Sequence, residues 1–150
     1  MKRFRFRLQR LLEIREHETK LAQNSWVAAR RAAQVAADQL RVASALRAES
    51  AERLLARRQG RMSVHEWRQS AELHEALVAQ EWLAAERLAD ALREEEHRRQ
   101  QLTEAERREK VLRRLRERRA EEYRRAVEAA EQAAIDEMAQ NVFLEGGGRR

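Results

Sequence analysis

Proline and cysteine are both absent from this 150-residue chain, and glycine occurs only four times. Without cysteine there is neither a disulfide framework nor a thiolate metal site. Sheets need turn residues and runs of β-branched side chains, and here turn chemistry is confined to Gly60 and to the glycines at 146–148. These absences exclude a β-rich fold.

Long apolar runs are also missing, and none approaches the roughly 20 residues that span a bilayer. The N-terminus is basic, but it lacks the apolar core and the cleavage site of a secretory signal. A cytoplasmic protein is therefore expected.

Charged residues make up 39% of the chain and aromatic residues 5%. Arginine accounts for 29 of the 32 basic residues, and there are 27 alanines. Such a composition is typical of long helices and coiled coils. The net charge of +6 suits an anionic partner, whether nucleic acid, a lipid surface or an acidic protein.

Two long stretches without helix breakers predict helices over about residues 4–58 and 64–144, with a turn at 59–63. Gly60 can adopt the left-handed conformation that ends a helix. Ser63 and Glu66 form an S-x-x-E capping box at the start of the next helix. The predicted fold is all-α: an antiparallel coiled-coil hairpin forming a single domain over 1–144, followed by a flexible tail at 145–150.

Apolar residues three and four apart mark one face of each predicted helix. The simplest pairing places Leu8 near Arg114 and leaves the second helix without a partner beyond about residue 118. An uncovered apolar stripe usually marks an interaction site, here for another protein or a second copy. The first stripe comprises Leu8, Leu11, Ala22, Ala29, Ala36, Ala43 and Leu46, flanked by Leu12, Trp26, Ala33, Leu40 and Leu54. The second comprises Val64, Trp67, Ala71, Val78, Ala85, Leu88, Leu92 and Leu102, and its uncovered end comprises Tyr123, Val127, Ile135 and Met138.

Catalytic signals are missing from the sequence. It contains no phosphate-binding glycine loop and no nucleophile elbow, and none of its four histidines pairs with another at i,i+4. A two-helix protein also offers no cleft that would desolvate a nucleophile. The chain is therefore expected not to be an enzyme and to bind neither cofactor nor metal.

The first ten residues carry five positive charges that alternate with Phe4, Phe6 and Leu8, and the first acid is Glu13. Such a segment could bind an acidic protein surface, phosphate or anionic lipid, or it could simply cover the end of the helix pair. Cations at a helix N-terminus oppose the helix dipole, and this local cost favours a function.

Three segments in this order resemble the FliJ family, the small coiled-coil component of the bacterial flagellar export apparatus, and the resemblance covers nearly the whole chain. The opening segment is Phe4-Arg5-Phe6-Arg7-Leu8-Gln9-Arg10-Leu11-Leu12-Glu13, followed by Arg15-Glu16. The second is Glu109-Lys110-Val111-Leu112-Arg113-Arg114-Leu115 with Arg118-Arg119 and Glu122-Tyr123, and the third is Asp136-Glu137-Met138-Ala139 with Phe143.

The resemblance implies a non-enzymatic stalk that enters the hexameric export ATPase, contacts the cytoplasmic domain of the membrane export gate and helps export chaperones to cycle. It also implies a cytoplasmic protein held peripherally at the inner membrane, at the flagellar base, through the export apparatus. The residues implied for ATPase binding are Phe4, Phe6, Leu8, Leu11, Leu12, Leu115, Tyr123, Ile135 and Met138. Those implied for gate binding are Gln39, Leu46, Leu73 and Leu77, and Ser50 and Ser70 stand where some relatives have tyrosine.

Three other readings remain open: an arginine-rich coiled coil that binds nucleic acid, the equivalent stalk of a virulence type III secretion system, and a purely structural dimeric coiled coil. Specific nucleic-acid binding is disfavoured because acids interleave almost everywhere beyond residue 12, whereas a zipper-type basic region is a long acid-free stretch. The chain also lacks the aromatic platforms on which single strands stack.

Overall fold

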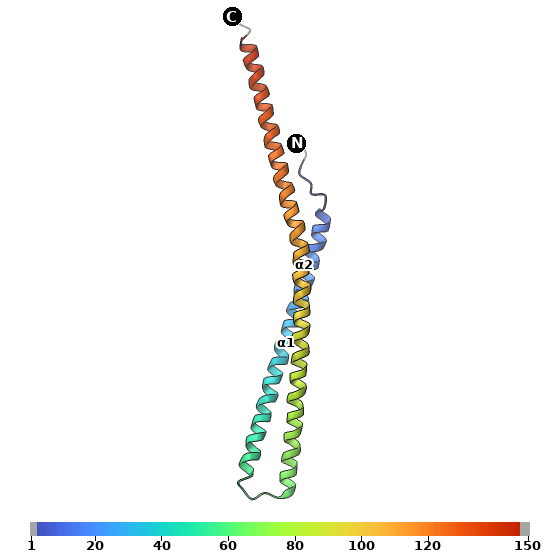
Figure 1. Ribbon diagram of the computed structural model, residues 1–150, viewed down its shortest axis with the longest axis vertical. Coiled ribbons are helices and arrows are strands. Elements are labelled where there is room, and N and C mark those ends of the chain that lie inside the picture. The colour runs from blue at the N-terminus through green and yellow to red at the C-terminus, as the bar shows by residue number, and fades with distance from the viewer. Residues whose placement is uncertain (1–2, 148–150) are drawn as a thin grey trace. The chain divides into compact units, whose positions relative to one another are not determined.

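The computed structural model describes residues 3–147, with only the backbone of 145–147, and it contains two long helices (Figure 1). Helix α1 comprises Gln9–Arg57 and helix α2 comprises Val64–Gly147. The two helices pack against each other, the structure is 92% helical, and the described residues form no strand. The predicted antiparallel helical hairpin is therefore confirmed.

The observed helix ends differ from the predicted ones. Helix α1 begins at Gln9 instead of about residue 4, and residues 3–6 form a non-helical segment, here called the arm. Several cations in a first helical turn would oppose the helix dipole, which explains the late start. Helix α2 continues to Gly147 instead of 144, and residues 148–150 of the predicted tail lie outside the described residues.

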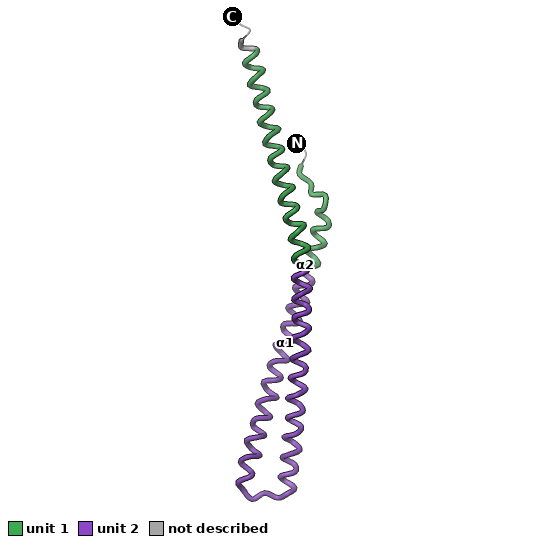
Figure 2. The backbone as a smooth tube through the Cα atoms, viewed as in Figure 1, with its two compact units in different colours: residues 1–19, 105–150 green, residues 20–104 purple. Residues whose placement is uncertain are grey.

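The chain divides into two compact units (Figure 2). We call residues 1–19 with 105–150 the terminal unit and residues 20–104 the turn unit. Each unit contains a segment of both helices, so each has its own helix–helix contacts.

The turn contains the predicted capping box in full. The Ser63 N–H donates to Glu66 Oε2 at 2.9 Å, and the Glu66 N–H donates to Ser63 Oγ at 3.2 Å. The expectation for Gly60 is wrong, because no described residue has a positive φ. Helix α1 instead ends in a tighter turn, in which the Gly60 N–H donates to the Arg57 carbonyl at 3.2 Å.

We call the residues of the two helices that face each other the seam. In the turn unit the seam agrees only in part with the predicted stripes. Ala33 and Ala36 are 4% and 7% exposed and Ala84 is 8% exposed, whereas Leu46 is 44% exposed. Ala36, predicted to lie in the first stripe, is therefore buried as expected, and so is Ala33, predicted to flank it. Val78 and Leu92, predicted to lie in the second stripe, are instead 43% and 50% exposed.

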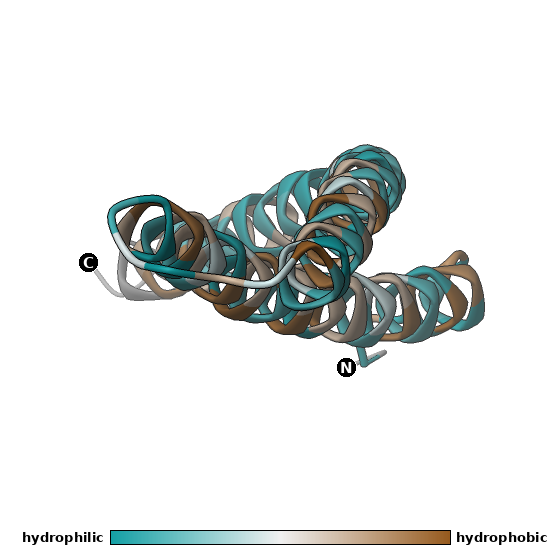
Figure 3. Cartoon of the chain, turned by 90° about the horizontal axis from the view of Figure 1, so that it is seen from below, coloured by the Kyte–Doolittle hydropathy of each residue, from teal (hydrophilic) through white to brown (hydrophobic). Residues whose placement is uncertain are grey.

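Polar pairs in the seam explain this difference. The ring of His74 lies 3.3 Å from the hydroxyl of buried Ser50, and Arg47 forms an ion pair with Glu81 at 2.5 Å. A search for periodic apolar residues does not select these polar seam positions. It selects the neighbouring line of apolar residues on the same helix. Hydrophilic and hydrophobic residues indeed alternate along both helices (Figure 3).

In the terminal unit, Leu12 is the most buried residue, with 1% of its surface exposed. Glu16 and Arg113 join the helices through an ion pair at 3.3 Å. The ring of Phe4 lies against Tyr123, so the pairing extends beyond the predicted limit near residue 118 and Tyr123 is not uncovered. From residue 128 to 144 every side chain is exposed; residues 126–144 of α2 are here called the overhang.

Candidate partner-binding surfaces

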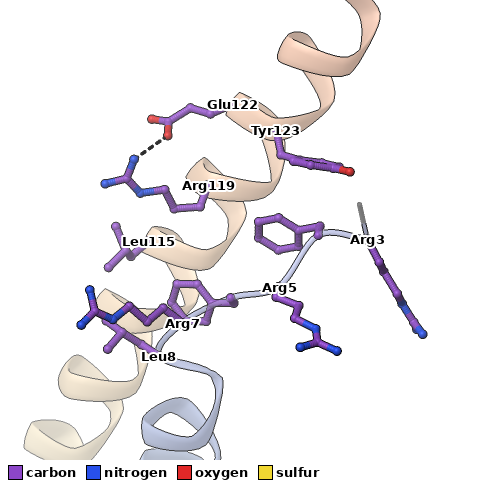
Figure 4. Close-up of a pocket in the computed structure, with 10 residues that line it drawn as sticks. Arg3, Arg5, Arg7, Leu8, Leu115, Arg119, Glu122 and Tyr123 are labelled. Atoms are coloured by element: carbon purple, nitrogen blue, oxygen red, sulfur yellow. Dashed lines mark hydrogen bonds and ion pairs between the residues drawn. The ribbon is translucent and has the colours of Figure 1, made fainter. Parts of the chain in front are cut away.

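The terminal unit contains an open pocket of about 750 Å³ between the segment before α1 and the exposed side of α2 (Figure 4). We call it the terminal pocket. Its floor is apolar and aromatic, and its edge is basic. The lining residues are Arg3, Phe4, Arg5, Phe6, Arg7, Leu8, Leu115, Arg119, Glu122 and Tyr123.

The arm forms one wall of this pocket, and its side chains alternate in exposure along the chain. Phe4 and Phe6 are half-buried, whereas Arg3, Arg5 and Arg7 are exposed. Arg3 and Arg5 point away from α2 in Figure 4. The alternation seen in the sequence therefore separates an apolar inner side from a basic outer side.

The charged residues that line the pocket are mostly basic. Among its lining residues the only acid is Glu122, which accepts a hydrogen bond from Arg119 at 2.9 Å and is thus paired with a positive charge. Within the described part of the chain, Arg3, Arg5 and Arg7 make no ion pair. The pocket therefore offers apolar contact with unpaired positive charge around it, which suits an acidic partner with apolar anchors.

Five of the nine residues assigned to ATPase binding line the terminal pocket: Phe4, Phe6, Leu8, Leu115 and Tyr123. Leu12 instead forms the core of the unit, and Leu11, 37% exposed, lies outside the pocket.

Ile135 and Met138 lie on the overhang and are 55% and 61% exposed. Ile135 is 12 residues beyond Tyr123, about 18 Å along the helix. The sequence analysis named Phe143 only as part of the resemblance and did not name Val142 or Leu144. These three residues are 71–82% exposed and form an apolar run near the end of the chain.

The turn unit has two shallow grooves that share Leu46. One, of about 280 Å³, is lined by Leu46, Leu73 and Leu77 among others, and the second, of about 400 Å³, by Gln39 and Leu46 among others. All four residues assigned to gate binding therefore lie in adjoining grooves.

Val35 and Val42 also line the second groove, and the sequence reasoning missed them. They are 55% and 57% exposed and stand seven residues apart, next to the predicted stripe. That spacing was the available signal, since residues seven apart lie on the same face of a helix.

Ser50 and Ser70, the two serines singled out in the sequence analysis, both make contacts with the other helix. Ser50 is 8% exposed and faces His74, and the Ser70 hydroxyl accepts a hydrogen bond from Arg57 at 2.8 Å. The apolar residues that line the first groove are all leucines.

In the described part of the chain, no group of three or more metal-ligating side chains gathers at one place. None of the described helices is long and apolar enough to cross a membrane.

The fold defines the chain as an antiparallel helical-hairpin protein. The sequence pattern of the family described as "Flagellar FliJ protein" matches residues 4–148, so the chain belongs to the FliJ family. No curated protein and no solved structure matches it. Family membership makes it a flagellar export-related protein, and the family is a non-enzymatic component of flagellar export.

Proposed function

We propose that this protein is the stalk of the flagellar export machinery and binds the hexameric export ATPase through its terminal unit. The observation that carries the proposal is the terminal pocket. It gathers Phe4, Phe6, Leu8, Leu115 and Tyr123 at one place, although they come from opposite ends of the sequence. Clustered aromatic anchors with arginines beside them have the composition of protein-interaction hot spots.

The grooves of the turn unit are the proposed binding surface for the cytoplasmic domain of the membrane export gate. Leu46 and Leu73 are 44% and 57% exposed, and Gln39 lies beside them. Docking there would hold the protein peripherally at the inner membrane, and the same contacts would let it assist the cycling of export chaperones.

The test separates the two surfaces. Alanine at Phe4, Phe6 and Leu8 should abolish stimulation of ATPase ring assembly while leaving gate binding intact, because these side chains lie at the end of the seam. The matched control, alanine at Leu46 and Leu73, should do the reverse. ATPase activity, gate binding and helix content by circular dichroism are measured for each variant.

Loss of both activities in both variants would indicate general unfolding. If the intact protein bound neither the ATPase nor the gate domain, the proposed function would be wrong.

A further inference from the structure

Charge is separated along the terminal unit. Residues 2–10 carry five positive charges and no acid, whereas residues 126–144 carry four acids and no base. The four acids are Glu128, Glu131, Asp136 and Glu137. One chain therefore carries two surfaces of opposite charge, each with apolar residues among its charges.

The overhang has the shape of a docking helix. Ile135, Met138 and Val142 follow each other at spacings of three and four, so they share one face of α2. They are 55%, 61% and 71% exposed. Nothing in the described chain covers them, and acids flank the stripe they form.

The two surfaces cannot meet within one chain. The arm lies beside residues 115–123 of α2, and the overhang continues the same helix away from that point. No proline occurs in the chain, and no glycine lies between Gly60 and Gly146. A sharp reversal of α2 would need such a helix break, so the complement must come from another molecule.

We propose that this molecule is a second copy of the chain. Two copies pair antiparallel through their terminal units, and the acidic overhang of each lies against the arm and terminal pocket of the other. In this two-fold arrangement each overhang lies on the arm of the other copy, so the two contacts are identical and form together. Asp136 and Glu137 of one copy then lie opposite the arm of the other, and Val142 and Phe143 reach the apolar floor of its terminal pocket.

The pairing covers the same residues that the proposed function assigns to the ATPase. If that proposed function is right, the dimer and the ATPase complex exclude each other. Protein that is not bound to the ATPase would then form the dimer, in which the apolar residues of the terminal unit are covered. The dimer itself does not depend on the proposed function.

Sedimentation equilibrium of the full chain over a concentration series tests the pairing. At low salt we expect a monomer–dimer equilibrium that weakens as sodium chloride rises, because exposed charges are screened. A triple reversal, Arg3→Glu, Arg5→Glu and Arg7→Glu, should weaken it about tenfold or more. The matched control reverses Arg61, Arg68 and Arg87, exposed residues of the turn unit, and should leave it unchanged.

A mixing experiment identifies the two complementary surfaces. Asp136→Lys with Glu137→Lys should weaken self-association as the triple reversal does. Combining this double variant with the triple variant should restore a dimer, because each then offers the charge the other lacks. A monomer at every concentration for the unaltered chain, or no recovery on mixing, overturns the proposal.

Cross-linking between introduced cysteines tests the relative orientation of the two copies. Because the natural chain has no cysteine, only the introduced thiols react. Asn141→Cys mixed with Gln9→Cys should give a heterodimer with a short bismaleimide, while Asn141→Cys alone should give none. Cross-linked Asn141→Cys homodimers would indicate a parallel pair and overturn the proposal.

Dimerisation without ATPase binding would refute the proposed function alone, and ATPase binding by a strictly monomeric protein would refute this inference alone.

Discussion

The ring of Phe4 lies with its centroid 5.6 Å from that of Tyr123, and the two planes meet at 46°. This tilted contact lies within the range that aromatic pairs prefer. It joins residues 119 positions apart in the sequence and holds the arm on α2. The terminal pocket exists because this contact keeps the arm beside the helix.

Removing either ring should therefore release the arm. A double-mutant cycle with Phe4→Leu and Tyr123→Leu should give a coupling free energy of about 0.5–1.5 kcal/mol. Urea unfolding of the four proteins measures it. A coupling of zero would mean that the two rings do not stabilise each other in solution.

Leu12 and Leu11 make a matched pair for testing the seam of the terminal unit, since they are adjacent leucines with 1% and 37% of their surfaces exposed. Leu12→Ala should lower the free energy of unfolding by about 2–5 kcal/mol, because it leaves a cavity in the core. Leu11→Ala should cost less than about 1 kcal/mol. Equal losses would place the seam on a different face of α1.

Two substitutions in the turn should change the free energy of unfolding in opposite directions. Ser63→Ala removes the acceptor for the Glu66 N–H and should cost about 1 kcal/mol. A Cβ at Gly60 would meet only the Arg57 carbonyl oxygen, at 3.9 Å. Because φ there is not positive, Gly60→Ala should stabilise the fold by about 0.4–1 kcal/mol through a less flexible unfolded chain. Thermal melts of both variants decide this, and destabilisation by Gly60→Ala would contradict the observed turn.

Glu66 should make part of the stability dependent on pH. Hydrogen bonds from the Ser63 backbone and then from its hydroxyl lower the pKa of Glu66 below its usual value near 4.5. Because the folded state then favours the ionised form, the stabilisation is complete above the unfolded-state pKa and is lost as the pH falls through the lowered one.

Glu66→Gln tests this linkage, since it removes the titration but keeps an acceptor for the Ser63 N–H. Its stability deficit relative to the unaltered chain should shrink as the pH drops below about 4.5. Some acid sensitivity should persist in the variant, because hydrogen bonds from Arg99 and then from Gln100 lower the pKa of Glu96. A deficit that stays constant between pH 7 and pH 3 would contradict the assignment.

Association with nucleic acid should be weak, sequence-independent and strongly salt-dependent, since only counterion release would drive it. Fluorescence anisotropy with several DNA and RNA sequences over a salt series measures this. A sequence preference that survives at physiological salt would favour the nucleic-acid reading over the stalk.

The sequence by itself determined the two helices, the position of the turn and its capping box. These features depend on local chemistry: the lack of proline, the placement of Gly60, and the reach of the Ser63 and Glu66 side chains to each other's backbone N–H groups. It also showed the alternation of Phe4 and Phe6 with arginine, but it placed these residues in a helix, and only the structure showed that they belong to a non-helical arm.

Only the tertiary structure decided which residues form the seam and where the helices pair. An alanine-rich helix has several lines of apolar residues at similar spacing, and each would bury little area. Periodicity alone therefore does not show which line faces the other helix. The choice is made by contacts between distant residues: Ser50 with His74, Arg47 with Glu81, and Phe4 with Tyr123. Such contacts depend on both helices at once, which is why the sequence of either helix could not reveal them.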